Sequence, residues 1–513
     1  MPPTAGQPAT SVDDRPHGPT SPTPPPPRPG PRKFGEGAVS GAAVMTAAKV
    51  VGAVVAFSAL AILARLLPPE DYGLVAMVTS VTAFFVVFSD FGLALVTIQR
   101  PNLSREQLST LFWLNLGFGL LLFAATVGLA PLLVWFYGDP RLFWITAATA
   151  CVFPLGAVGV QHQAMLKRDM KFRRLAVARI VGTTAAAVAA VAAALLGAKW
   201  WSVVIQDVAI AGVTSAACIV AYPWRPGPPR RCEGLGGLVR FGGALTGHGM
   251  LGYFGNNMDN ILIGRFCGVA ELGLYSRSYA LMMRPISFAG YGVGETAIPA
   301  MSRVAYDPAA LRASFRRMFS LCALLGLPIC ACGAFWTDDV VLTIFGPKWT
   351  AATPMLRVLF IAAAARMLSA STGWIYVATG RPGRMLLWQA MWTPVALAAF
   401  LAGLPWGGFG VASAYAIALW ATLLPAFWYC LRGTSVSLRD AITPTLRPLL
   451  CAVAAAAAGL LLSDGLLSMS LAGPLRLIVR VAVGGVVYVA ATVLFVPLGR
   501  ESLRYLLARF GRT

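Results

Sequence analysis

The sequence predicts an all-α integral membrane protein of about fourteen transmembrane helices, arranged as two pseudo-symmetric six-helix lobes followed by two C-terminal helices. Three observations lead to this prediction. Of the 513 residues, 57% are hydrophobic and 12% are charged, whereas soluble domains carry roughly 25% charged residues. The apolar residues gather in runs long enough to cross a bilayer. A stretch of the first half of the chain also matches a stretch of the second half.

Residues 1–33 precede the first apolar run and contain 12 of the 36 prolines. A segment of this composition cannot bury enough apolar surface to offset the entropy of ordering, so we expect a disordered cytoplasmic tail. A docking site for a proline-binding partner is the alternative interpretation. No apolar stretch typical of a cleavable signal peptide lies near Met1.

The remaining chain divides into apolar runs, each close to the ~20 residues that a bilayer core requires of a helix. Fourteen spans are predicted near 38–64, 72–98, 109–137, 142–160, 175–197, 200–222, 241–264, 272–300, 317–336, 351–379, 385–404, 409–431, 448–463 and 475–498. The predicted domains are an N-lobe at 38–222, a basic cytoplasmic linker at 223–240, a C-lobe at 241–431, a final helix pair at 448–498 and a basic cytoplasmic tail at 499–513.

The distribution of basic residues predicts the orientation of these spans. If the N-terminus is cytoplasmic, the inside segments hold 28 Lys and Arg residues and the outside loops hold six. Basic residues concentrate on the cytoplasmic side of membrane proteins, so both termini are predicted to be cytoplasmic. This bias accounts for the net charge of +21 without nucleic acid as a partner.

Short loops exclude several classes of enzyme. The longest predicted outside connection, 337–350, has about fourteen residues, which leaves no room for an external catalytic domain of a polymerase or glycosyltransferase. The chain contains no G-x-x-x-x-G-K-[ST] phosphate-binding loop. The nine cysteines show no paired metal-ligand spacing. We therefore predict a transporter with no catalytic residues, no metal and no cofactor.

An internal repeat relates the two predicted lobes. At an offset of 200 residues, 61–100 aligns with 261–300 without a gap and with six identities, which include the pairs Arg65/Arg265 and Gly73/Gly273. An offset that spans an even number of helices predicts two lobes of the same orientation, related by an axis along the membrane normal. Arg65 and Arg265 are candidate outer-gate residues. Alternatively, each is a cation favoured at a helix C-terminus.

Ionisable and amide side chains interrupt four of the predicted spans, where a charge costs several kcal/mol unless it faces a cavity or a partner. In the eighth span, Arg277, Arg284 and Glu295 fall within about 20° of one helical stripe at 100° per residue. The other three spans place polar residues near mid-depth or on one face of a helix. These residues are Lys49 in the first span, Asp90 in the second, and Asn256, Asn257 and Asp259 in the seventh.

We interpret this set as the lining of a central aqueous cavity between the lobes. The candidate binding residues for a multivalent anion are Lys49, Asn256, Asn257, Arg277 and Arg284. The candidate ion-coupling residues are Asp90, Asp259 and Glu295. The alternative is that the charges only fix helix packing, as the pairs Lys49–Asp90, Asp259–Arg277 and Arg284–Glu295. Arg357 and Arg366 lie on opposite faces of their helix, so at most one of them can line the same cavity.

Four stretches resemble the polysaccharide flippases of the multidrug/oligosaccharidyl-lipid/polysaccharide exporter superfamily. These are LARLLPPEDYGLVAM, FSDFGLALVTIQRPNLSREQLSTLFWLNL, NNMDNILIGRFCGVAELGLYSRSYALMMRP and FGPKWTAATPMLRVL. The resemblance covers the chain from residue 38. It implies two six-helix lobes with two further helices. It also implies export of a polyprenyl-pyrophosphate-linked oligosaccharide repeat unit for lipopolysaccharide or exopolysaccharide synthesis.

From the resemblance we expect a flippase of the bacterial cytoplasmic (inner) membrane that works by alternating access. The diphosphate-sugar head would bind cations between the lobes, by position Lys49, Arg277 and Arg284, while the polyprenyl tail stays in lipid along the two C-terminal helices. Membrane lipids and other polysaccharide-assembly proteins are further candidate partners. Alternatives are a multidrug/cation antiporter of the same superfamily, which would need a carboxylate-rich cavity, a peptidoglycan lipid-precursor flippase, and a lipid-bound polymerase, which the short loops disfavour.

Overall fold

The computed structural model is helical throughout the part of the chain that it describes. The described residues are 36–86, 88–89, 94, 97–98, 103–229, 253, 255, 257–466 and 473–496. Ten segments within them are long and apolar enough to span a membrane. The all-α membrane class is therefore confirmed, while the number of fourteen spans remains a prediction. The predicted spans at Asp90 and at Asn256 include positions outside the described residues.

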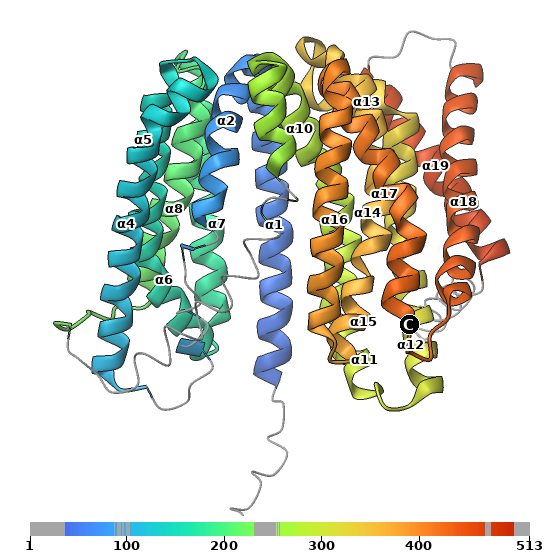
Figure 1. Ribbon diagram of the computed structural model, residues 1–513, viewed down its shortest axis with the longest axis horizontal. Coiled ribbons are helices and arrows are strands. Elements are labelled where there is room, and N and C mark those ends of the chain that lie inside the picture. The colour runs from blue at the N-terminus through green and yellow to red at the C-terminus, as the bar shows by residue number, and fades with distance from the viewer. Residues whose placement is uncertain are drawn as a thin grey trace, which may run out of the picture.

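Two groups of helices lie side by side in Figure 1, and we call them the N-lobe and the C-lobe. The N-lobe contains α1 (Glu36–Leu66), α2 (Pro69–Val86), α4 (Arg105–Tyr137), α5 (Arg141–Ala150), α6 (Val152–Arg168), α7 (Phe172–Leu195) and α8 (Trp201–Ala221). The C-lobe contains the helical residues 257–266, α10 (Val269–Pro285), η1 (Ile286–Tyr291), α11 (Gly292–Arg303), α12 (Pro308–Phe335), α13 (Thr337–Val340), η2 (Val341–Phe345), η3 (Pro347–Ala352), α14 (Thr353–Ala370), α15 (Thr372–Ala378), α16 (Pro382–Gly403), η4 (Leu404–Trp406) and α17 (Gly407–Leu431).

A last helix pair, α18 (Leu438–Leu466) and α19 (Gly473–Phe495), covers the side of the C-lobe that faces away from the N-lobe (Figure 1). The end of the molecule that carries the α1–α2 turn lies at the top of Figure 1, and we call it the outer end, following the predicted orientation. The opposite end, which carries the basic α6–α7 turn, is the inner end.

Local signals in the sequence explain where the helices begin and end. Helix α4 begins with a capping box, in which the Ser104 side chain accepts from the Gln107 backbone N–H and the Gln107 side chain accepts from the Ser104 N–H. It ends at Gly138, whose φ of 75° suits a residue without a side chain. In the outer turn that follows, hydrogen bonds from Arg141 lower the pKa of Asp139, so this carboxylate stays charged.

The eighth predicted span is not one regular helix. Helix α10 ends at Pro285, a π-helical segment η1 follows, and α11 begins at Gly292. Proline has no backbone N–H to donate, and a π turn contains more residues than an α turn. The single stripe predicted for Arg277, Arg284 and Glu295 is therefore wrong beyond Pro285, because the helical register changes before Glu295.

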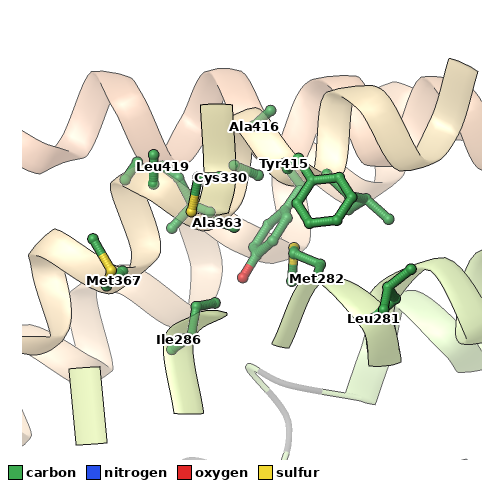
Figure 2. Close-up of a cluster of buried hydrophobic side chains, with 14 of the residues drawn as sticks. Leu281, Met282, Ile286, Cys330, Ala363, Met367, Tyr415, Ala416 and Leu419 are labelled. Carbon is green, nitrogen blue, oxygen red and sulfur yellow. The ribbon is translucent and has the colours of Figure 1, made fainter. Parts of the chain in front are cut away.

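The C-lobe core is tightly packed where α10, η1, α12, α14 and α17 meet. Figure 2 shows the Tyr415 ring among the side chains of Met282, Ala363 and Leu419, which come from three of these elements. Helix α12 approaches α14 closely at Gly326, where a Cβ would lie 1.9 Å from the Met367 sulfur and would displace the end of that side chain. Close packing of this kind gives the interior of the C-lobe a low compressibility.

Ion pairs attach the α18–α19 pair to the C-lobe at both ends. At the outer end, the buried carboxylate of Asp339 binds Arg476, at 2.6 Å, and Arg480 in α19. At the inner end, Asp440 accepts from Arg312 of α12 at 2.7 Å. Between them, the Trp336 indole donates to the carbonyl of Ala456 at 3.0 Å. The pair is therefore fixed to the C-lobe along its length.

Asp339→Ala is expected to destabilise the protein by about 3–5 kcal/mol, because it leaves the buried Arg480 guanidinium without its counter-charge. The measurement is the thermal unfolding midpoint of the full chain in detergent micelles. The matched control is Asp338→Ala, since Asp338 is 62% exposed and its pair with Arg357 lies at the surface. An equal decrease in both variants would contradict the assignment of Asp339 as the anchor of α19.

Candidate functional site

The two lobes touch at their outer ends, where α2 crosses α10 (Figure 1). The contact is a backbone contact between the repeat-related residues Gly73 and Gly273. A Cβ on Gly73 would lie 1.9 Å from the carbonyl oxygen of Val269, and a Cβ on Gly273 would lie 1.9 Å from that of Pro69. No other residue type fits at either position while the lobes stay together. We call this contact, with the lobe-to-lobe contacts around it, the outer seam.

The outer seam also includes the C-terminal end of α1, whose last carbonyls have no partner within the helix. The C-lobe supplies the partners: the Trp349 indole donates to Ala64 at 2.7 Å, and the Lys348 ammonium donates to Leu66 at 3.3 Å. Arg65 donates in the opposite direction, from α1 to the carbonyl of Thr343. The end of the first N-lobe helix is thus capped by residues of the C-lobe.

Two further cations cross the outer seam on aromatic rings. The Arg265 guanidinium lies 5.6 Å from the ring centroid of Phe136 in α4, and that of Arg277 lies 4.2 Å from the Tyr72 ring in α2. Tyr72 itself packs edge-on against Trp349 at 5.4 Å. Both predicted gate residues, Arg65 and Arg265, therefore reach the opposite lobe. Arg277, predicted to line the central cavity, lies in the outer seam instead.

Below the seam, an ion pair joins the lobes. The Lys49 ammonium, near the middle of α1, lies 3.0 Å from a carboxylate oxygen of Glu295 in α11. Both side chains are exposed, at 58% and 69%, so the pair lies in open space between the lobes. The structure thus joins a predicted binding residue to a predicted ion-coupling residue. In the packing alternative, Glu295 is paired with Arg284 rather than with Lys49. The other pair, Lys49–Asp90, stays a prediction because Asp90 lies outside the described residues.

Arg284 lies at an apolar cavity of about 470 Å³ that reaches from α1 to α19. Phe57 of α1 contributes to its wall, and Trp336, Val481 and Tyr488 belong to the part between the C-lobe core and α19. Arg284 is exposed, and within the described part of the chain it has no ion pair or hydrogen-bond partner. It is also the one charged residue among the described residues of the cavity wall. The cavity is therefore long and apolar, and the aliphatic part of Arg284 forms part of its wall.

The seventh predicted span carries its polar residues into the C-lobe. Asp259 is buried and accepts from the Tyr275 hydroxyl at 2.7 Å, rather than pairing with Arg277. The Asn257 amide donates to the carbonyl of Tyr253 in its own helix at 3.1 Å. Asn256 and Asp90 lie outside the described residues, so their predicted roles stay predictions.

Sequence reasoning missed the C-lobe residues that cap α1. Lys348 and Trp349 lie in FGPKWTAATPMLRVL, a stretch that carries the family resemblance but contains no recognised motif. Their partners are backbone carbonyls about 280 residues away along the chain, and no periodic pattern indicates such a contact. Gly73 and Gly273 were visible only as one identity of the repeat.

Two lobes of membrane-length helices, joined at one end and with charged residues between them, are the architecture of a membrane transporter. The chain belongs to the polysaccharide biosynthesis protein family, whose model matches residues 62–354. This result confirms the predicted family resemblance.

Relatives with assigned names extend the match over most of the chain. The teichuronic acid biosynthesis protein TuaB of Bacillus subtilis is 27% identical over 427 residues, which cover 82% of this chain and 88% of that protein. The lipopolysaccharide biosynthesis protein WzxC of Escherichia coli is 24% identical and covers 67% and 71%. The succinoglycan biosynthesis transport protein ExoT of Rhizobium meliloti is 24% identical and covers 88% and 91%.

Solved structures share the fold. The lipid II flippase MurJ in an inward closed conformation superposes with a TM-score of 0.70 and 12% identity, over 90% of this chain and all of that one. An inward-facing multidrug resistance transporter of the MATE family gives 0.60 and 11% identity, over 74% and 94%. At these identities the likeness concerns the fold alone.

Proposed function

We propose that this protein moves a polyprenyl-pyrophosphate-linked oligosaccharide across the bacterial cytoplasmic membrane for the synthesis of a surface polysaccharide. The printed names of the relatives support this substrate class, since they include a lipopolysaccharide biosynthesis protein and a succinoglycan biosynthesis transport protein. The chemistry of the space between the lobes supports it independently.

The observation that carries the proposal is Arg284 at the wall of the apolar cavity. A polyprenyl diphosphate has a dianionic group directly attached to a long hydrocarbon chain. Arg284 has its aliphatic part in the wall of a long apolar cavity, and its side chain is exposed without a partner among the described residues. Arginine forms forked hydrogen bonds to phosphate oxygens and stays charged in a poorly hydrated site. The diphosphate is placed at Arg284, and the tail lies along the part of the cavity between the C-lobe core and α19.

Alternating access follows from the distribution of contacts between the lobes. The outer seam closes the outer end, so the head group reaches the cavity from the inner, cytoplasmic side. Opening of the seam then releases it outside. The membrane is negative inside, and outward movement of an anion gains about 2.3 kcal/mol per charge per 100 mV. Asp259 is the described carboxylate that we propose for coupling to a counter-ion, whereas Glu295 is proposed to hold Lys49 in place. Both chain termini are proposed to be cytoplasmic.

The test uses the full chain in proteoliposomes and a fluorescent short-chain isoprenyl diphosphate linked to a disaccharide. Wild-type protein is expected to move the probe between leaflets. Arg284→Gln should slow movement by roughly ten- to a hundredfold, since a hydrogen bond to a charged group contributes about 1.5–3 kcal/mol. The control is Arg317→Gln, because Arg317 is an exposed arginine near the inner end of α12.

Two results would contradict the proposal. One is an equal rate in wild-type, Arg284→Gln and Arg317→Gln proteins of unchanged thermal stability. The other is export of a cationic dye by vesicles that do not move the lipid probe, which would instead favour the multidrug class.

A further inference from the structure

A second cavity, with a different chemistry, lies inside the C-lobe. Its volume is about 290 Å³, and its wall is built by η1, α14, α15, α16 and α17. We call it the C-lobe pocket. It is separate from the apolar cavity at Arg284: Ile286, two residues farther along the chain, belongs to the wall of the pocket. Nothing in the proposed handling of the diphosphate and the tail uses this pocket.

Helix α16 gives the pocket an aromatic and amide surface. Trp388 and Trp392 are one helical turn apart and therefore share a face, and Gln389 lies beside them. The Trp388 ring is held in place by stacking on Tyr429 at 5.9 Å. Within the described residues, neither indole N–H and no atom of the Gln389 amide has a hydrogen-bond partner. All three side chains are half-buried and belong to the pocket wall.

The opposite wall supplies a cation held in a fixed position. The Arg366 guanidinium donates to the hydroxyl of Tyr415 and lies 5.9 Å from the ring centroid of Tyr279. The buried carboxylate of Asp259 accepts from the Tyr275 hydroxyl at 2.7 Å and lies outside the pocket wall. The pocket therefore offers preorganised hydrogen-bond donors on a guanidinium that is already engaged by two tyrosine side chains.

Hydroxyl groups complete the wall. Ser369, Thr372 and Thr422 each donate to a carbonyl of their own helix or of the adjoining helix, at 2.9, 2.8 and 2.7 Å. Each hydroxyl oxygen still has the capacity to accept a hydrogen bond. An apolar helix packed in a lobe core does not require such a concentration of polar groups, because each one costs free energy unless a partner satisfies it.

We propose that the C-lobe pocket binds one uncharged sugar ring of the lipid-linked oligosaccharide. The proposal rests on the proposed function and adds to it a site for the glycan. A pyranose has an apolar C–H face, which suits a tryptophan ring, and an edge of hydroxyls, which suits Arg366, Gln389 and the three hydroxyl side chains. The volume lies at the lower limit of small-molecule sites, about 300 Å³, and so suits one ring rather than a chain.

This site makes the C-lobe pocket a determinant of which repeat unit is transported. A site that hydrogen-bonds the hydroxyls of its ligand discriminates strongly against an analogue that lacks them, because polar groups of the site are then left unpaired. The Arg284 cavity recognises features that all polyprenyl diphosphates share. The C-lobe pocket would recognise the sugar that distinguishes one repeat unit from another.

The test is saturation-transfer-difference NMR on the full chain in lipid nanodiscs. The probes are methyl β-D-glucopyranoside, N-acetylglucosamine and glucuronic acid, each measured alone. Wild-type protein is expected to transfer saturation to ring protons of at least one of the two neutral sugars. Gln389→Leu removes only the amide and should weaken binding roughly two- to tenfold, as expected for one hydrogen bond. Trp388→Leu should weaken it further.

The control is Trp428→Leu, since Trp428 is 58% exposed on α17 and lies outside the pocket wall. Its sugar signal should equal that of wild-type protein. Absence of any sugar signal in wild-type protein, binding of glucuronic acid alone, or a signal unchanged by Gln389→Leu and Trp388→Leu would each overturn the proposal. The lipid-probe assay tests the proposed function separately. If the probe moves but sugar binding does not depend on the pocket, only the pocket proposal is overturned. If the pocket binds sugar but the probe does not move, only the transport proposal is overturned.

Discussion

Gly73→Ala is expected to hold the outer ends of the two lobes apart. The added Cβ would lie 1.9 Å from the carbonyl oxygen of Val269, a backbone atom that cannot move aside without displacing α10. Overpacking of this kind costs about 1–3 kcal/mol. Applied to an equilibrium between closed and open seams, that cost shifts the populations by about 5- to 150-fold. Gly273→Ala should act in the same way through the carbonyl of Pro69.

Two measurements on the full chain check this expectation. Spin labels on Pro140→Cys and Trp406→Cys, one at the outer end of each lobe, report the separation of the lobes in a background without native cysteines. In Gly73→Ala the distance distribution should move to longer values. Movement of the lipid probe should fall by a similar factor, because the transport cycle needs the closed state for loading from the inside.

Gly52→Ala and Gly117→Ala are the matched controls, since a Cβ at either position meets nothing within 4 Å. Both glycines lie within helices, so the substitution is of the same kind as Gly73→Ala. The added Cβ at either position makes no contact with the other lobe. If Gly73→Ala has the distances and the transport rate of these controls, the glycine contact is not a gate.

The glycine pair also shows how far sequence reasoning reached. Hydropathy predicted the membrane class because a bilayer demands long apolar helices whatever the tertiary arrangement. The repeat aligned Gly73 with Gly273 as one identity among six. The alignment could not show that these two residues touch each other. A repeat indicates which positions are equivalent, but it gives no distance between them.

The charged residues show the same limit. Helical periodicity reports which side chains share a face of one helix, and it indicates nothing about which other helix lies opposite. Lys49 and Glu295, 246 residues apart, were both predicted to be functional but not to be partners. The stripe through Arg284 failed at Pro285, where the backbone leaves the α-helical period. Arg277 was expected in the cavity and instead lies on Tyr72, because an aromatic face can take the place of a carboxylate.

Lys49→Gln is expected to slow movement of the lipid probe by roughly ten- to a hundredfold, while Glu295→Gln should change it much less. We assign Lys49 as a diphosphate contact that Glu295 holds in place when no substrate is bound. A hydrogen bond to a charged group contributes about 1.5–3 kcal/mol. An exposed ion pair that only fastens the lobes contributes about 0–1 kcal/mol, and both members of this pair are exposed. The sizes of the two effects therefore separate binding from packing.

The charge-reversed pair, Lys49→Glu with Glu295→Lys, tests whether the ion pair itself or its orientation matters. It keeps an ion pair between the lobes but moves the ammonium from α1 to α11, so transport should stay as slow as in Lys49→Gln. If the pair only fastened the lobes, both single variants would be equally impaired and the reversal would restore the wild-type rate. That pattern would remove Lys49 from the binding site and leave Arg284 as the described cation that meets the diphosphate. Our assignment predicts a slow transport rate in the reversed pair and a nearly normal rate in Glu295→Gln. This result would show that the carboxylate is dispensable and that an ion pair alone is insufficient. Transport would then require the positive charge at position 49 itself.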